Sequence, residues 1–343
     1  MATTTKPQAH ESAMTGSNAF DTIMAMAGGA CLPRCLHVVA DLGVADALDD
    51  EPKSVIELAM SVGAHADSLS RVLRLLSAYG VFEIDGDKVR HSPASRLLRS
   101  DHPQSMRALA RMFGLYVNWN AYSEFEHSVR TGQPATTKTL PGGLWGYFQE
   151  NPEQSRIFNE AMVAKAQVQI PAVVAAYDFS HFGTIADIGG GRGHLLQAVL
   201  AANRSARGIL FDLPTVIQDA AGAASDRLKL HAGDFFKDPL PAADAYIIME
   251  VIHDWADKES LAVFEAIRRA AKPGAALFVV EQLVPNDPGP HWSKTLDIHM
   301  LTLVGGLQRT REEYDALLNR AGFELVRVHP THSDVSILEA SAA

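Results

Sequence analysis

The spacing of apolar residues divides the chain into a helical N-terminal half and a C-terminal half in which strands and helices alternate. Up to about residue 180, apolar positions recur at helical spacing, as in Leu69, Val72, Leu73 and Leu76. Beyond that point, short apolar runs alternate with helical segments, which is typical of a parallel sheet with helical crossovers. We predict strands at 184–188, 208–212, 227–231, 245–249 and 275–280, and helices at 193–202, 214–221 and 258–271.

The last two predicted strands depart from this alternation. A helix is predicted over 310–321, and two strands, 323–328 and 334–340, follow it with only five residues between them. A link of this length is too short for a parallel crossover, so the last pair must be antiparallel. The fold class predicted for this half is α/β, a doubly wound sheet that ends in an antiparallel strand.

The N-terminal region has the pattern of a winged helix. A helical stretch to about residue 48 turns at Gly43, and Ser54 and Glu57 form a capping-box pattern that opens a helix over 55–62. A second helix, 69–79, is followed by strands 81–84 and 88–91 around a tight turn. Winged helices often bind DNA, but residues 36–100 contain seven Lys or Arg against ten Asp or Glu. We therefore expect a packing or dimerisation role instead.

Between these two parts lies a mostly helical stretch. Helices are predicted at 105–130, 145–148 and 152–177, with a Gly- and Pro-rich break at 131–143. We expect four parts: a disordered tail (1–17), a winged-helix-like dimerisation domain (18–105), a helical linker that covers the substrate (106–180) and a cofactor-binding domain (181–343).

The composition of the chain disfavours some classes of binding partner. The chain has 343 residues, is 47% hydrophobic and 20% charged, and carries a net charge of −10. An acidic balance disfavours nucleic acid or an anionic membrane surface as the main partner. No apolar run is long enough to span a bilayer, so a cytoplasmic location is expected.

A glycine-rich loop follows the first strand of the C-terminal half, in Ile185-Ala-Asp-Ile-Gly-Gly-Gly-Arg-Gly-His194. Glycines between a buried strand and a helix let the backbone approach a nucleotide-like ligand. The dinucleotide fingerprint needs glycine or alanine at its sixth position, where this chain has His194. The P-loop pattern is also absent. A nucleoside cofactor without a pyrophosphate fits better than NAD.

Acidic and aromatic residues follow the next two strands. Asp212 ends the second strand and is placed to bind ribose hydroxyls, while Asp234 and Phe235 follow the third and are placed to bind adenine. With the glycine loop they suit an adenosine that carries a small charged tail.

A histidine follows the fourth strand, in Glu250-Val-Ile-His-Asp-Trp255. Because ligands of open parallel sheets bind at the carboxyl ends of the strands, His253 is a candidate catalytic residue. The pairs Cys31 with Cys35 and Asp297 with His299 are too few to complete a metal site, and we expect no metal.

In combination these motifs resemble the S-adenosylmethionine-dependent small-molecule O-methyltransferases of plant phenolic and bacterial natural-product metabolism. The resemblance spans residues 20–340. It is carried by Asp187-Ile-Gly-Gly-Gly-Arg-Gly193, Phe211-Asp-Leu-Pro214, Gly233-Asp-Phe-Phe236, His253-Asp-Trp255, Val280-Glu281, Gly305-Gly306, and Arg309-Thr310 with Glu313. It implies a homodimer built through the N-terminal helices, and methyl transfer from S-adenosylmethionine to a hydroxyl of an aromatic or polycyclic acceptor.

The resemblance also implies roles for single residues. His253 matches the general base, and Glu281 and Glu313 match the acids that hold its imidazole. Cofactor contacts are expected at Asp187, Gly189, Gly191, Asp212, Leu213, Asp234, Phe235 and Met249. At Met249 plant members often have a lysine that touches the cofactor, so one polar contact is lost here. Acceptor contacts are expected at Trp145, Phe148, Phe158, Met162, Met300 and Leu303, and Asp254 is expected near the acceptor or the methionine moiety.

Two kinds of alternative remain open from the sequence. Relatives with the same fold methylate nitrogen or support decarboxylation or hydroxylation, and the presence of His253 with both glutamates favours O-methylation. A winged-helix regulator that senses a nucleoside ligand belongs to a different class, and the acidic balance disfavours it.

Overall fold

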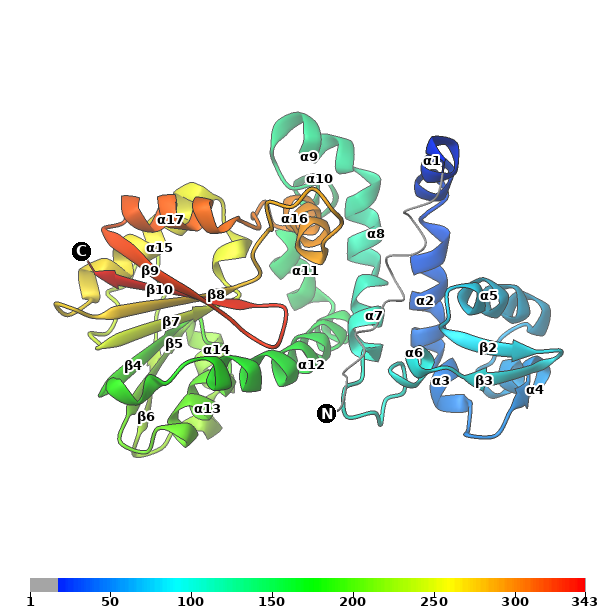
Figure 1. Cartoon of the computed structure of the whole chain (residues 1–343), viewed down its shortest axis with the longest axis horizontal. Coiled ribbons are helices and arrows are strands. Elements are labelled where there is room, and N and C mark those ends of the chain that lie inside the picture. Colours follow the sequence, from blue (N-terminus) through cyan, green and yellow to red (C-terminus); the bar gives the residue numbers. More distant parts are fainter. Residues whose placement is uncertain (1–17, 343) are drawn as a thin grey trace, which may run out of the picture. The chain divides into compact units, whose positions relative to one another are not determined.

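The computed structural model describes residues 18–342. The chain forms two compact units, one that ends at Leu115 and one that spans Tyr116–Ala343 (Figure 1). The predicted tail, 1–17, lies outside the described residues. The expected functional boundaries after residues 105 and 180 remain predictions.

The first unit contains the predicted helices and hairpin. Its elements are α1 (Ala19–Ala27), α2 (Cys31–Leu42), α3 (Val44–Ala47), β1 (Lys53–Ser54), α4 (Val55–Ser61), α5 (Ala66–Ala78), β2 (Phe82–Asp85), β3 (Lys88–His91), α6 (Pro93–Arg96) and α7 (Arg107–Phe113). The Ser54–Glu57 capping box is present in full, with Glu57 Oε2 accepting from Ser54 N at 2.7 Å. Helix α5 begins three residues earlier than the predicted start at residue 69, with His65 at its N-cap. The unpredicted strand β1 pairs with β3, so the sheet has the order β1-β3-β2.

Helix α1 carries large apolar side chains that are open to solvent in this chain. Phe20, Ile23, Met24 and Met26 are 57% to 71% exposed. The predicted continuous helix is broken here by Gly28 and Gly29, which separate α1 from α2. Within residues 18–342, no single helix has the length and apolar composition to cross a bilayer. Helices α1 and α2, which meet at an angle of 40°, have that length and composition only when they are taken together.

The second unit begins with helices and continues as the predicted α/β layer. Its helices are α8 (Tyr116–Ser123), α9 (Phe125–Thr131), α10 (Thr136–Thr139), α11 (Gly143–Glu150), α12 (Pro152–Ala176), α13 (His194–Ala202), α14 (Pro214–Asp219), α15 (Asp257–Ala270), α16 (Trp292–Leu303) and α17 (Arg311–Arg320), with 3₁₀ turns η1 (Phe179–His181), η2 (Ala221–Ala223) and η3 (Ile252–Asp254). Its strands are β4 (Thr184–Ile188), β5 (Arg207–Asp212), β6 (Leu228–Ala232), β7 (Ala245–Met249), β8 (Ala276–Glu281), β9 (Phe323–Pro330) and β10 (Ser336–Ala342). Pro171 lies inside α12 without ending it.

The seven strands of this unit form one sheet in the order β6-β5-β4-β7-β8-β10-β9. The first five are parallel to one another, and β10 is antiparallel to both β8 and β9. This confirms the predicted doubly wound sheet with an antiparallel end. Because β6, β5, β4 and β7 are parallel, their carboxyl ends lie side by side at one edge, and the order in which the strands are connected switches between β4 and β7.

Both faces of the sheet are buried. Successive residues of one strand serve opposite faces, so Ile247 packs with the cluster beneath α12 and α13, and Ile248 packs with the cluster beneath α15 and α17 (Figure 1). Both residues are fully buried. Two-sided burial explains why the strands are continuous apolar runs in the sequence.

Candidate active site

The glycine loop leaves β4 in a backbone conformation that favours glycine. Gly189, Gly191 and Gly193 have φ values of 69°, 59° and 75°. A Cβ at Gly189 would lie 3.0 Å from a methyl group of Val251, whereas at Gly191 no atom lies within 4 Å. The loop is therefore held on one side by the end of β7, and its backbone is open to a ligand at Gly191.

Asp212, at the end of β5, is bonded to this loop. Its Oδ2 accepts a hydrogen bond from Gly191 N at 2.8 Å, and its Oδ1 accepts one from Leu213 N at 2.7 Å. Asp187 lies beneath the loop with 1% exposure, and a Cβ on Gly190 would meet its carboxyl group at 2.4 Å. Burial, together with the charge of Asp212, raises the pKa of Asp187 to about 7. The carboxyl group of Asp187 is thus buried beneath the loop and packs directly against Gly190.

The residues after β6 lie at the same edge. The ring of Phe235 comes within 3.8 Å of the position of a Cβ on Gly189, and it makes an edge contact with Trp255. The carboxylate of Asp234 accepts hydrogen bonds from Phe236 N at 2.9 Å and Lys237 Nζ at 2.7 Å. The predicted adenine-binding pair is therefore next to the loop, although Asp234 already has two partners.

These observations test whether an adenosyl cofactor fits. Four neighbouring strand ends present an open glycine backbone, a carboxylate and an aromatic face, and these are the groups expected for a nucleoside with a charged tail. We expect Gly189, Gly191, Asp212 and Phe235 to hold it.

The cofactor fit predicts the effect of replacing Asp212 with alanine. Loss of hydrogen bonds to a charged carboxylate should weaken binding of S-adenosylhomocysteine at least about tenfold. Isothermal calorimetry measures this directly, with Asp219→Ala on the exposed side of α14 as a matched control. Equal affinity in Asp212→Ala and the native chain would contradict the assignment.

His253 lies in the short turn that follows β7, and Glu281 of β8 orients it. Its Nδ1 is 2.7 Å from Glu281 Oε2, and the other carboxylate oxygen accepts from Ile252 N at 2.9 Å. The imidazole is 7% exposed and Glu281 is fully buried. Because β7 and β8 are adjacent parallel strands, their ends bring the two residues together. The structure therefore places the predicted base against one of its two predicted acids.

The second acid beside the imidazole differs from the sequence expectation. Glu313 is exposed and closes a capping box at the start of α17, where its Oε2 accepts from Thr310 N at 2.8 Å. Asp254, which was expected near the acceptor or the methionine moiety, has its Oδ1 3.6 Å from His253 Nε2. The pattern Thr310-x-x-Glu313 is itself a capping-box signature, and in this structure that local role holds the Glu313 side chain.

The charges around the imidazole shift its pKa. Burial alone would lower the pKa of His253, but Glu281, Asp254 and Glu250 outweigh burial and raise it to about 9. Burial raises the pKa of Asp254 to about 6, against the opposing effect of His253. The imidazole thus has a strong affinity for a proton.

Two residues that were not predicted to belong to the site hold this turn, Lys165 and Arg309. Lys165 of α12 forms an ion pair with Glu250. Arg309, 1% exposed, donates to the carbonyl oxygens of Ile252 at 3.3 Å and Trp255 at 3.0 Å. In the sequence, Lys165 lies within a long predicted helix and Arg309 lies just before another one. Neither feature of the sequence indicates which distant residue the side chain contacts.

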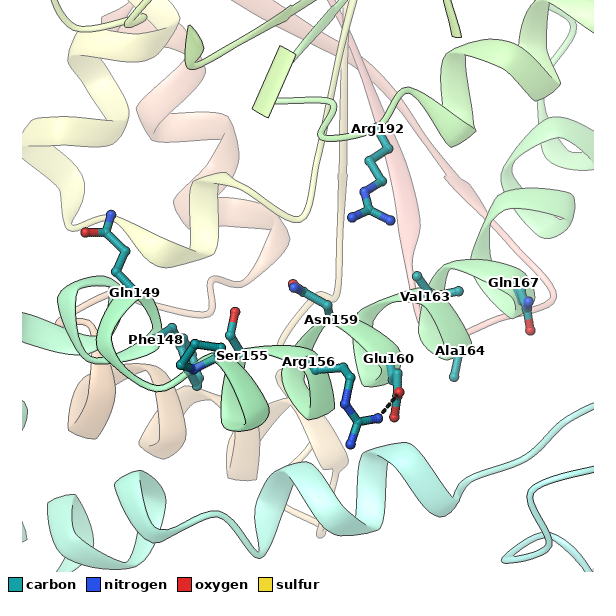
Figure 2. Close-up of a pocket in the computed structure, with 11 residues that line it drawn as sticks. Phe148, Gln149, Ser155, Arg156, Asn159, Glu160, Val163, Ala164, Gln167 and Arg192 are labelled. Carbon is teal, nitrogen blue, oxygen red and sulfur yellow. Dashed lines mark hydrogen bonds and ion pairs between the residues drawn. The ribbon is translucent and has the colours of Figure 1, made fainter. Parts of the chain in front are cut away.

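A cavity of about 730 Å³ opens between α12 and the glycine loop. Figure 2 shows Arg192 extending from the loop toward the side of α12 that carries Asn159, while Arg156 pairs with Glu160. The residues that line the cavity are Phe148, Gln149, Pro152, Ser155, Arg156, Asn159, Glu160, Val163, Ala164, Gln167 and Arg192.

Of the predicted acceptor residues, Phe148 lines this cavity. It belongs to a ring cluster with Phe158, at 4.8 Å between centroids, and Trp145, at 6.4 Å. Met162 lies on α12 and is half-buried, and Met300 and Leu303 lie on α16. Asp297 and His299, also on α16, have other partners: Asp297 accepts from Gln308 N at 2.8 Å, and His299 Nδ1 lies 3.2 Å from the hydroxyl of Tyr122.

Comparison with known proteins shows where the chain belongs. Residues 122–324 match the model of the O-methyltransferase domain, and residues 24–101 match that of the O-methyltransferase dimerisation domain. A phenazine O-methyltransferase of Lysobacter antibioticus is 40% identical over 324 residues, which cover 93% of this chain and 95% of that protein. A mitomycin biosynthesis 6-O-methyltransferase of Streptomyces lavendulae is 35% identical, with 90% of each chain covered.

The chain is also similar to a solved structure of a methyltransferase that contains the cofactor product. CalO1, a methyltransferase of calicheamicin biosynthesis in its S-adenosylhomocysteine-bound form, superposes with a TM-score of 0.85 at 31% identity, covering 95% of this chain and 100% of that one. Fold, strand-end geometry and sequence similarity agree. The chain therefore belongs to the O-methyltransferase family and is an S-adenosylmethionine-dependent enzyme of that family.

Proposed function

We propose that this enzyme methylates a hydroxyl group of an aromatic or polycyclic small molecule, with His253 as the general base and Glu281 as the residue that orients it. The observation that carries the proposal is the 2.7 Å contact between His253 Nδ1 and Glu281 at the strand end next to the glycine loop. A buried carboxylate on Nδ1 holds the imidazole in place and leaves Nε2 to face an acceptor.

The chemistry of the methyl donor and of the acceptor determines what the protein must contribute. S-adenosylmethionine supplies a methyl group on a positively charged sulfur, which is already activated for transfer. The protein must align the acceptor oxygen and remove its proton. A phenol has a pKa near ~10, so an imidazole with a pKa of about 9 would accept its proton at little free-energy cost. Asp254, 3.6 Å from Nε2, helps to stabilise the imidazolium that forms.

The raised pKa of His253 predicts the pH dependence of the reaction. Only the neutral imidazole accepts a proton, so activity should be low below the pKa of His253 and rise as pH increases through it. We expect kcat/KM to increase about tenfold per pH unit up to roughly pH 9. In Glu281→Gln the main charge that raises the pKa is gone, so the midpoint should move to lower pH while kcat falls. A midpoint that is the same in both proteins would contradict the assignment of this limb to His253.

The acceptor class is inferred from the cavity and from relatives. The ring of Phe148, which packs against Phe158, provides an apolar surface in the cavity for a flat ring system, and Arg156, Asn159 and Arg192 provide polar groups. One relative, from Streptomyces carzinostaticus, is named a 2,7-dihydroxy-5-methyl-1-naphthoate 7-O-methyltransferase, and another, from Streptomyces cremeus, a 3-amino-4-hydroxybenzoate 4-O-methyltransferase.

A panel of hydroxylated phenazines, naphthoates and benzoates tests the proposal. We expect a mass increase of one methyl group on at least one of them, located by NMR at an aryl oxygen. Aliphatic alcohols and amines are assayed beside this panel, and methylation of these compounds with no aryl ether from any phenolic member would overturn the acceptor class.

N-methylation is the second candidate. An 8-amino-8-demethylriboflavin N,N-dimethyltransferase of Streptomyces davaonensis is 36% identical over 316 residues, so the fold and sequence class include nitrogen acceptors. An arylamine does not need a strong base before attack, whereas a phenol does. The buried His253–Glu281 pair therefore favours oxygen, and paired hydroxy and amino analogues of one ring system would separate the two.

The assembly and location are also proposals. We propose a homodimer through the N-terminal helices, supported by the match to the dimerisation domain and by the exposed apolar residues of α1. Light scattering should give twice the 37.1 kDa chain mass. We further propose a cytoplasmic enzyme that has neither nucleic acid nor membrane as a partner, in keeping with the net charge of −10.

A further inference from the structure

The backbone is strained where β7 leads into the turn that carries His253. Glu250 has φ of 54°, and it is the one non-glycine residue with positive φ among those the structure describes. This conformation costs free energy for a residue with a Cβ, so its surroundings must hold it. It directs Val251 against Gly189, and His253 follows two residues later.

The side chain of Glu250 is held by a lysine from a distant part of the chain. Lys165 Nζ pairs with Glu250 Oε2, and these side chains are 19% and 14% exposed. The other oxygen of Glu250 accepts from Gln282 Nε2 at 3.3 Å. Lys165 lies on α12, the helix that also lines the cavity with Val163 and Ala164. The ion pair therefore connects α12 to the turn that carries His253.

The pair is also part of the charge distribution around the imidazole. One carboxylate oxygen of Glu250, one ring nitrogen of His253 and one carboxylate oxygen of Glu281 all lie within 4.8 Å of one another, and Asp254 lies next to His253. Three carboxylates meet one imidazole here, and Lys165 is the cation that offsets one of them. Without it, a partly buried carboxylate would be left unpaired beside the base.

We propose that Lys165 is a positioning residue for methyl transfer, which neutralises Glu250 and so holds the strained exit of β7 and balances the charge around His253. This inference rests on the proposed role of His253 as general base. Lys165 acts through Glu250 and not by contact with the reacting atoms.

Several other groups act on the same cluster, and they must stay constant in a test. From the elements packed around it they are Glu281 (β8), Asp254 (η3), Tyr314 (α17), Arg309 (before α17) and Asp334 (before β10). None of these is altered in the variants below, so a change in the titration of His253 is due to the Lys165–Glu250 pair.

The test uses opposite charge removals in the full-length enzyme. Lys165→Met leaves the Glu250 carboxylate uncompensated, and Glu250→Gln leaves the Lys165 ammonium uncompensated. With ¹³C-labelled histidine, NMR reports the titration of His253 without cofactor or acceptor. We expect its midpoint to rise by about one pH unit in Lys165→Met, to fall by about one unit in Glu250→Gln, and to return near the native value in the double variant.

Activity and binding complete the experiment. The acid limb of the kcat profile should move in the same directions, and Lys165→Arg should restore it. Lys272→Met removes a half-exposed lysine that pairs with Asp244 away from this cluster, and it is the matched control with no expected shift. If Lys165→Met does not fold, Glu250→Gln and the double variant carry the test.

The outcomes separate the two proposals. Shifts of one sign only, or no shift of the His253 midpoint, would overturn the positioning role. So would a loss confined to S-adenosylhomocysteine affinity or acceptor KM, because Lys165 would then be a binding residue. If the NMR midpoint moves as expected while the kcat profile does not, the electrostatic effect of the Lys165–Glu250 pair on His253 stands, but the base assignment fails, and with it the role of Lys165 in methyl transfer.

Discussion

His253→Ala should lower kcat by about 10²–10⁴-fold, because the positioned base is lost while the activated methyl donor remains. S-adenosylhomocysteine binding should change little, since the glycine loop, Asp212 and Phe235 are untouched. Single-turnover product formation with the best acceptor measures the first quantity, and calorimetry measures the second. The effect on kcat should shrink at high pH, where the acceptor ionises without help.

His181→Ala is the matched control for this variant. Its imidazole is exposed and lies 3.8 Å from Asp178, outside the strand-end site. Its kcat should equal that of the native enzyme. Full activity in His253→Ala, with cofactor binding intact, would show that another group removes the proton or that none is needed.

Gly306→Ala should disrupt the same turn from its other side. A Cβ at this position would lie 2.0 Å from the carbonyl oxygen of His253 and 2.6 Å from the backbone carbon of Asp254. Backbone atoms cannot rotate away as a flexible side chain can, so the turn or the 305–309 segment must shift. We expect the free energy of unfolding to fall by about 1–3 kcal/mol and kcat to drop with it. Urea denaturation and steady-state kinetics measure the two effects.

Gly146→Ala provides the comparison for Gly306→Ala. Gly146 lies inside helix α11, and no atom lies within 4 Å of a Cβ placed there. Alanine at this helical position should leave the unfolding free energy unchanged or raise it by up to ~1 kcal/mol. Equal stability and activity in Gly306→Ala and Gly146→Ala would mean that the close approach of Gly306 to the turn does not position His253.

The α/β layer could be predicted from the sequence because its signals are local. Strands β4 and β7 have the predicted bounds, since each is an apolar run buried on both faces and ended by a change to glycine or charge. The antiparallel end followed from a five-residue link alone. Helix breaks were harder to place: α1 ends at Gly28 and Gly29, whereas α12 continues through Pro171.

The site was predictable where a residue lies at a strand end and less so where tertiary packing decides. His253 and Glu281 come together because their strands are neighbours. From the sequence, the position of His253 after a strand made it a candidate, whereas Glu281 was implied only by the resemblance to the O-methyltransferases. The ion pair of Lys165 with Glu250 joins residues 85 positions apart, and no periodic pattern encodes such a contact. Glu313 shows the reverse case, since its local capping role accounts for its position.

A crystal structure with S-adenosylhomocysteine and a productive acceptor would test the central claim most directly. The account predicts the adenosyl group across the ends of β4, β5 and β6, and the acceptor hydroxyl within about 3 Å of His253 Nε2, on the line that continues from the sulfur. An adenosyl group bound away from these strand ends, or an acceptor oxygen that faces a different base, would contradict it.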